Sequence, residues 1–235
     1  MSSAFSLRNR GLVRSGADRE RILLRTNLVL LVALLVLIFI VPVVTPRNSD
    51  LTRVLLIIIV VSGLFAADFS KRAFRTLTAI GSLVTIVTLL DLFFSGLPGF
   101  TSVAFLLNTI FFVMVTIALV AHVARAKEAY GSTLLCAINS YLLIGLTLSI
   151  LLLIIYLNEP GSFNNAGQGN NNFSEFLYFG FVTLTTLGYG DITPVAPVAR
   201  SLSTFTALFG QLYLVIIMAI IIGKFLIVKN PTNQP

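Results

Sequence analysis

Charged residues are scarce in this sequence. Of its 235 residues, 11% are charged and 57% are hydrophobic, and the mean hydropathy is +0.97. A soluble domain carries roughly 25% charged residues, so the composition excludes a soluble protein and predicts an integral membrane protein. The chain also has no Trp, one Cys and one His. A lone cysteine, Cys136, cannot form a disulfide within the chain.

Catalytic motifs are missing as well. The sequence contains no HExxH, no P-loop and no Ser–His–Asp or paired-carboxylate pattern. One His and one Cys argue against a catalytic or metal-binding cluster, so we expect neither an enzyme nor an organic cofactor.

Six apolar runs are long enough to cross a bilayer, which needs roughly 20 helical residues. They cover residues 26–45, 52–69, 76–95, 102–123, 133–157 and 199–227. Short separators with Pro or Gly divide most of them. The sequence therefore predicts an all-α membrane protein with six transmembrane helices.

Basic residues alternate between the separators. Six arginines precede the first run: Arg8, Arg10, Arg14, Arg19, Arg21 and Arg25. Further basic residues follow the second, fourth and sixth runs, whereas the alternate separators have few or none. The positive-inside rule then predicts that both termini are cytoplasmic. We expect the basic N-terminal tail to contact anionic lipid rather than nucleic acid, because a membrane span follows at once.

One polar segment interrupts the last third of the chain. Residues 158–172 read NEPGSFNNAGQGNNN, which predicts a solvent-exposed loop. The next residues, Phe173 to Thr186, are apolar but too short to span the membrane twice. The stretch TTLGYGD, Thr185 to Asp191, must bring the chain back out. A short re-entrant helix followed by a glycine-containing loop is the predicted shape, because irregular backbone at membrane depth must be shielded or line a wet cavity.

Such a loop suits a cation. Glycines allow successive carbonyls to point towards one axis, and rings of carbonyl oxygens from several subunits can replace the water around a monovalent cation. The negative end of the short helix dipole would favour a cation at the same place.

The motif TTLGYGD, with FVTL before it, resembles the signature of potassium channels in the tetrameric cation-channel superfamily. FGQLYLVIIMAIIIGK in the last run also resembles prokaryotic members, and the specific match covers residues 131–227. The resemblance implies a homotetramer in a prokaryotic plasma membrane, with potassium ions in a selectivity filter. The filter residues would be Thr186, Leu187, Gly188, Tyr189 and Gly190. Leu187 stands where the usual motif has valine.

Four residues are expected to support the filter: Tyr178, Phe179, Thr185 and Asp191. Members of the family often have tryptophans in the pore helix, and Tyr178 and Phe179 occupy those places here. Tyr178 keeps a hydroxyl that can donate a hydrogen bond to Asp191, whereas Phe179 has no donor.

The resemblance also places the inner-helix hinge at Gly210. Residues four apart share a helix face, so Leu214, Met218 and Ile222 continue a stripe below it. Four copies of each would form hydrophobic rings that can gate by dewetting. The alternative is that the stripe only packs against the fifth span and that Gly210 permits close helix contact.

The fourth run, 102–123, contains no Arg or Lys. A voltage sensor needs several charges in one mobile helix, so we expect weak voltage gating. The predicted organisation is a basic tail (1–25), a four-helix sensor-like domain without gating charges (26–124), a linker (125–132), a pore domain (133–227) and a C-terminal tail (228–235). A non-selective cation channel and a subunit of a potassium uptake transporter remain the alternatives.

Overall fold

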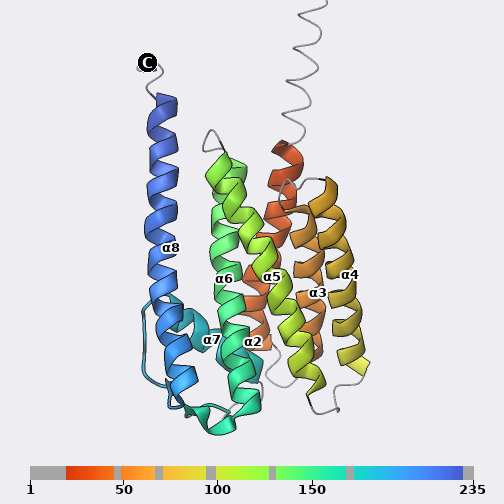
Figure 1. The fold of residues 1–235 in the computed structure, drawn as a ribbon, viewed down its shortest axis with the longest axis vertical. Coiled ribbons are helices and arrows are strands. Elements are labelled where there is room, and N and C mark those ends of the chain that lie inside the picture. The colour runs from red at the N-terminus through yellow and green to blue at the C-terminus, as the bar shows by residue number, and fades with distance from the viewer. Residues whose placement is uncertain are drawn as a thin grey trace, which may run out of the picture.

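The protein is a bundle of long helices that run side by side (Figure 1). The structure is a computed structural model that describes residues 20–44, 49–66, 71–93, 99–126, 131–167 and 172–229. Most of both predicted tails and part of the predicted linker lie outside these residues. Within them, five helices are long and apolar enough to cross a membrane, so the protein is an all-α membrane protein.

The elements follow the predicted runs closely. The N-terminal helix, Glu20–Val43, includes a π-helical stretch, η1 (Val36–Ile40), and ends in α2 (Val41–Val44). The other helices are α3 (Ser49–Phe65), α4 (Lys71–Phe93), α5 (Phe100–Arg125), α6 (Gly131–Asn158), α7 (Asn172–Leu184) and α8 (Pro197–Lys229). A 3₁₀ turn, η2 (Pro160–Ser162), and two short strands, β1 (Phe163–Asn164) and β2 (Thr193–Pro194), complete the order.

The second predicted span, α3, is the shortest of the six long helices. It has 17 residues, at the lower limit of what crosses a bilayer core. The other five are the candidate spans, and the count of six membrane crossings stays a prediction.

Large apolar side chains cover the outside of the bundle. Phe39, Phe93 and Ile117 are each more than 60% exposed. Water would penalise such a surface, whereas lipid accepts it, because lipid tails are as apolar as these side chains.

Helix α6 lies in the middle of the bundle and contacts several other helices. It packs against α5 on one side and against α7 and α8 on the other. Two glycines allow α7 to approach it closely. A Cβ atom at Gly180 would lie 2.0 Å from Ser149 Oγ, and a Cβ atom at Gly145 would lie 2.5 Å from the Phe181 ring. Any side chain at either position would force the two helices apart.

Buried polar side chains link the helices at both ends of the bundle. At one end, Asn27 Nδ2 donates to the Ala66 carbonyl at 2.6 Å, and Asn139 Nδ2 on α6 donates to Asn27 Oδ1 at 3.0 Å. At the other end, Arg53 Nε lies 2.7 Å from Asp91 Oδ2, and both residues are buried. This ion pair links α3 to α4.

Candidate functional site

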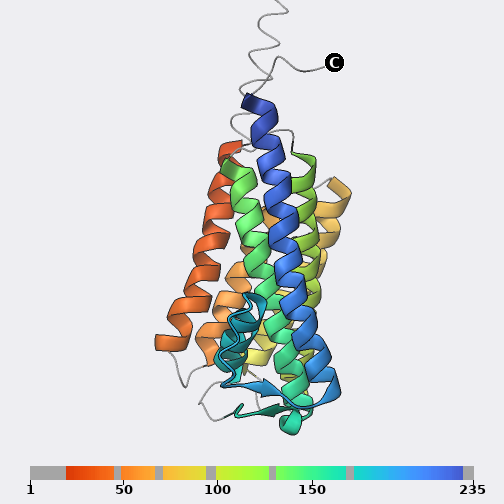
Figure 2. The same cartoon turned by 90° about the vertical axis from the view of Figure 1, so that its left-hand side faces the viewer.

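The short helix α7 and the loop after it lie beside α8, at the end of the bundle opposite the start of the N-terminal helix and the end of α8 (Figures 1 and 2). Helix α7 begins at Asn172 and ends at Leu184, as the apolar stretch predicts. Glu175 lies in its first turn, where a carboxylate is favoured by the helix dipole.

Backbone hydrogen bonds fold the chain back at the end of α7. The amides of Leu187 and Gly188 both donate to the Val182 carbonyl, at 2.9 and 3.3 Å, and the Thr186 amide donates to Thr183 at 3.0 Å. These bonds satisfy the amides of the loop on its α7 side. In the part of the chain that the structure describes, the carbonyls of residues 186–190 accept none of the hydrogen bonds found.

The backbone of the loop alternates in handedness. Thr186, Gly188 and Gly190 have φ of +60°, +56° and +78°, whereas the residues between them have negative φ. Alternating signs of φ allow successive carbonyls to share one side of the chain. Thr186 adopts the left-handed region without being glycine, which costs about 1–2 kcal/mol. A strained residue of this kind persists only when its surroundings hold it.

Gln211 on α8 is one of the groups that hold Thr186. Its Nε2 atom donates to Thr186 Oγ1 at 3.3 Å. This hydrogen bond links α8 to the loop after α7.

The side of the loop away from α7 is open. Residues 185–191 are all exposed in the single chain, with Leu187 at 56% and Tyr189 at 66%. One chain therefore provides a strand of carbonyls on a surface that no described residue of the same chain covers.

The predicted hydrogen bond behind the loop is present. Tyr178 Oη donates to Asp191 Oδ2 at 2.6 Å, and the Tyr178 ring stacks on the Tyr189 ring at 6.5 Å. The hydrogen bond is the main reason why the pKa of Tyr178 rises to about 12 and the pKa of Asp191 falls below its usual value. Both shifts favour the neutral tyrosine and the charged carboxylate.

The loop before α7 is also part of the site. The sequence predicted a solvent-exposed loop over residues 158–172. Within the described residues of this range the prediction is wrong at Ser162 and Phe163, whose side chains are buried. Strand β1 pairs antiparallel with β2, so Asn164 lies opposite Thr193 just after the filter motif. Asn165 Nδ2 donates to the Asp191 carbonyl at 3.1 Å. Phe163, an apolar residue in a polar stretch, was the one feature of the sequence that could have indicated this contact between the two loops.

The other two predicted support residues lie away from the carbonyl side. The Phe179 ring packs edge-on against Phe163 at 5.5 Å and against Phe176 at 6.3 Å. It therefore stabilises the contact of α7 with β1. Thr185 Oγ1 donates to the Phe181 carbonyl at 2.8 Å and extends the end of α7.

The predicted hinge has a packing role. Helix α8 runs without a break through Gly210, and a Cβ atom there would lie 2.2 Å from the Leu184 carbonyl oxygen. The predicted gate residues Leu214, Met218 and Ile222 are exposed at 40%, 54% and 51%. The structure thus brings Gly210 to the C-terminal end of α7, just before the predicted filter, and nothing in the described part of the chain covers the stripe.

The C-terminal part of α8 is hydrogen-bonded to α5. Lys224 Nζ donates to the Val123 and Ala124 carbonyls at the C-terminal end of α5. A cation at that end of a helix satisfies free carbonyls and the helix dipole.

A row of carbonyls at the end of a short helix, beside a long apolar helix, is the arrangement that the sequence motif predicts for an ion-channel pore. Comparison with known proteins agrees. A family model described as "Ion channel" matches residues 140–226, which include α7, the loop and most of α8. No solved structure matches at a significant level.

Three curated relatives are potassium channels by name. Two pore potassium channel c of rice is 38% identical over 71 residues, which are 30% of this chain and 14% of that protein. The inward rectifier Kirbac3.1 of Paramagnetospirillum magnetotacticum is 34% identical over 80 residues, 34% and 26% of the two chains. The potassium voltage-gated channel protein shk-1 of Caenorhabditis elegans is 33% identical over 66 residues, which are 27% of this chain and 12% of that protein.

The matches cover about a quarter or less of each of these relatives. They agree with the motif and the family model: the segment that holds α7, the loop and α8 is similar to segments of proteins named as potassium channels.

Proposed function

We propose that the chain forms a potassium-selective, passively conducting homotetrameric channel without strong voltage gating. The observation that carries the proposal is the alternation of φ from Thr186 to Gly190 with the amides tied to α7. This backbone presents carbonyl oxygens without competing partners, as a filter requires.

The ions would bind at the carbonyls of Thr186, Leu187, Gly188 and Tyr189 and at the Thr186 hydroxyl. Gly190 would close the outer mouth. Because the ligands are backbone oxygens, Leu187 in place of valine leaves their chemistry unchanged. Potassium is the proposed occupant because the tyrosine and both glycines keep the register of the potassium motif.

Four copies are needed, because one chain supplies one strand of the filter. An uncovered apolar surface supports the assembly. Helix α8 exposes Leu208, Leu212 and Val215 by 58%, 48% and 66%, and an apolar groove of about 760 Å³ lies between α5, α6 and α8. We assign this surface to contact between copies around the pore axis.

The proposed weak voltage dependence follows from the distribution of charge. Helix α5 has no Arg or Lys before Arg125 at its end. Arg53 and Asp91, buried charged residues of the four-helix part, are paired with each other. We keep the predicted division into a sensor-like domain (26–124) and a pore domain (133–227), a prokaryotic plasma membrane and cytoplasmic termini as parts of the proposal.

Recording from purified protein in planar bilayers tests the function. With potassium on one side and sodium on the other, the reversal potential should lie far from zero, on the side expected for potassium. The Gly188→Ala variant should lose this selectivity, because its φ of +56° is strained for any side chain. Gly223→Ala, in open space on α8, is the matched control. A reversal potential near zero, or a detergent-stable dimer or trimer, would overturn the proposal.

A further inference from the structure

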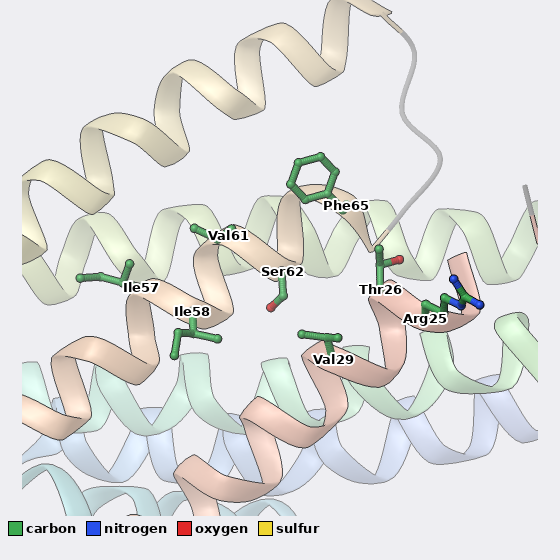
Figure 3. Close-up of a pocket in the computed structure, with 8 residues that line it drawn as sticks. All are labelled: Arg25, Thr26, Val29, Ile57, Ile58, Val61, Ser62 and Phe65. Atoms are coloured by element: carbon green, nitrogen blue, oxygen red, sulfur yellow. The ribbon is translucent and has the colours of Figure 1, made fainter. Parts of the chain in front are cut away.

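A groove lies between the N-terminal helix and α3, away from the pore (Figure 3). Its volume is about 400 Å³. Val29 lines one wall, and Ile58, Val61 and Phe65 line the other. These four side chains are 42–55% exposed, so the groove opens on the outer surface of the bundle.

Apart from Arg25, the polar side chains that line the groove are two hydroxyl groups. Thr26 Oγ1 donates to the Ile22 carbonyl at 3.0 Å, and Ser62 Oγ donates to the Ile59 carbonyl at 3.1 Å. Both hydroxyls are therefore used within their own helices. An occupant of the groove itself must be apolar.

One end of the groove is basic. Arg25 belongs to its lining and is exposed, and no ion pair of Arg25 occurs among the described residues. Arg21 lies four residues earlier, on the same face of the helix. The first turn of α4, which contains Arg72, lies at the same end of the bundle (Figure 1). Among the described residues, Glu20 is an acidic residue at this end, so basic side chains outnumber acidic ones there.

We propose that this groove binds an anionic phospholipid, with one acyl chain along Val29, Ile58 and Val61 and the phosphate at Arg25 and Arg21. The assignment rests on charge complementarity. An apolar groove that ends at Arg25, with Arg21 one helical turn earlier, matches a lipid with an acidic headgroup and an apolar tail. The proposal depends on membrane placement and not on ion selectivity, so either can fail alone.

The absence of tryptophan makes a direct test possible. Phe65→Trp places a single fluorophore in the groove, next to the basic end. Phe93→Trp places one at the opposite end of the bundle, where the native side chain is 77% exposed. The proteins are reconstituted in phosphatidylcholine vesicles that contain brominated phosphatidylglycerol or, separately, brominated phosphatidylcholine. Bromine quenches tryptophan only at close range.

Phosphatidylglycerol should quench the fluorescence of the Phe65→Trp protein with a clearly higher apparent affinity than phosphatidylcholine, and the Phe93→Trp protein should show no preference. Each arginine near a headgroup contributes about 1 kcal/mol, or about fivefold in binding. Adding Arg25→Gln to the Phe65→Trp protein should therefore reduce the preference at the groove about fivefold. Arg75→Gln, which changes an exposed arginine that does not line the groove, is the control and should leave the preference unchanged.

Three results would overturn the proposal. They are equal quenching of the groove fluorophore by the two lipids, a preference that Arg25→Gln leaves intact, and quenching by neither lipid. The last result would mean that another copy of the chain covers the groove. Helix content of each variant, measured by circular dichroism, confirms that the comparison is made between folded proteins.

Discussion

Replacing Gly210 with Ala separates two roles for the predicted hinge. If Gly210 is a bending point, the variant should lower open probability and leave the filter intact. If it is a contact point, the variant should disturb the filter, because the new Cβ atom would lie 2.2 Å from the Leu184 carbonyl oxygen. Leu184 is the last residue of α7, two residues before Thr186.

The size of the effect follows from this distance. An ordinary contact of a Cβ atom is at least 3.4 Å, so α7 or α8 must move by more than 1 Å. A backbone oxygen cannot rotate away as a side chain can. Overpacking costs about 1–3 kcal/mol, and the better helix propensity of Ala returns up to about 1 kcal/mol. We expect a net loss of about 1–2 kcal/mol per chain.

Gly223→Ala is the matched control in the same helix. No heavy atom lies within 4 Å of the Cβ position at Gly223, so this variant should gain up to about 1 kcal/mol from helix propensity. Thermal unfolding in detergent measures both variants, and the potassium–sodium reversal potential reports the filter. A Gly210→Ala protein that is as stable and as selective as wild type would refute the contact role.

Three further predictions concern other parts of the chain. Tyr178→Phe should speed inactivation with little change in protein yield. In wild type, the rate of inactivation should be constant from about pH 5 to 9 and should rise in acid. The hydrogen bond needs the charged Asp191 carboxylate, whose pKa lies below its usual value of 3.8, so the bond is lost only as the pH falls through this lowered pKa. On the alkaline side the bond persists because the pKa of Tyr178 is about 12. Unchanged currents in the variant would contradict this role. Asp91→Asn should cost up to about 3 kcal/mol in thermal unfolding, because buried Arg53 loses its main counter-charge; a loss below about 1 kcal/mol would count against it. Met218→Ser should raise open probability if the stripe gates by dewetting, and no change in assembled protein would place the gate in the filter.

Local patterns made much of the fold predictable. Long apolar runs define the helices, and the short run before TTLGYGD defines α7. The bond from Tyr178 to Asp191 was also predictable, because both residues belong to one compact motif. In each case, the information lies within a few residues of the feature.

Contacts between distant segments were not predictable. The pairing of β1 with β2 involves two residues on each side, too few to leave a periodic pattern. Arg53 lies within α3 and pairs with Asp91 on α4, a partner that the sequence does not reveal. Helices that are apolar all round do not reveal which face meets which neighbour, so the partner of a buried polar residue cannot be inferred from spacing.

The hydrogen bond between Asn139 and Asn27 limits how far this protein can be divided into fragments. Asn139 is fully buried on α6, the outer helix of the proposed pore domain, and its amide donates to the N-terminal helix. A fragment that begins at α6 would expose that amide and Cys136 to lipid, and an unsatisfied polar group there costs several kcal/mol. The proposed pore domain is therefore not an independent unit: transferring it alone to another protein would also require an apolar replacement at Asn139.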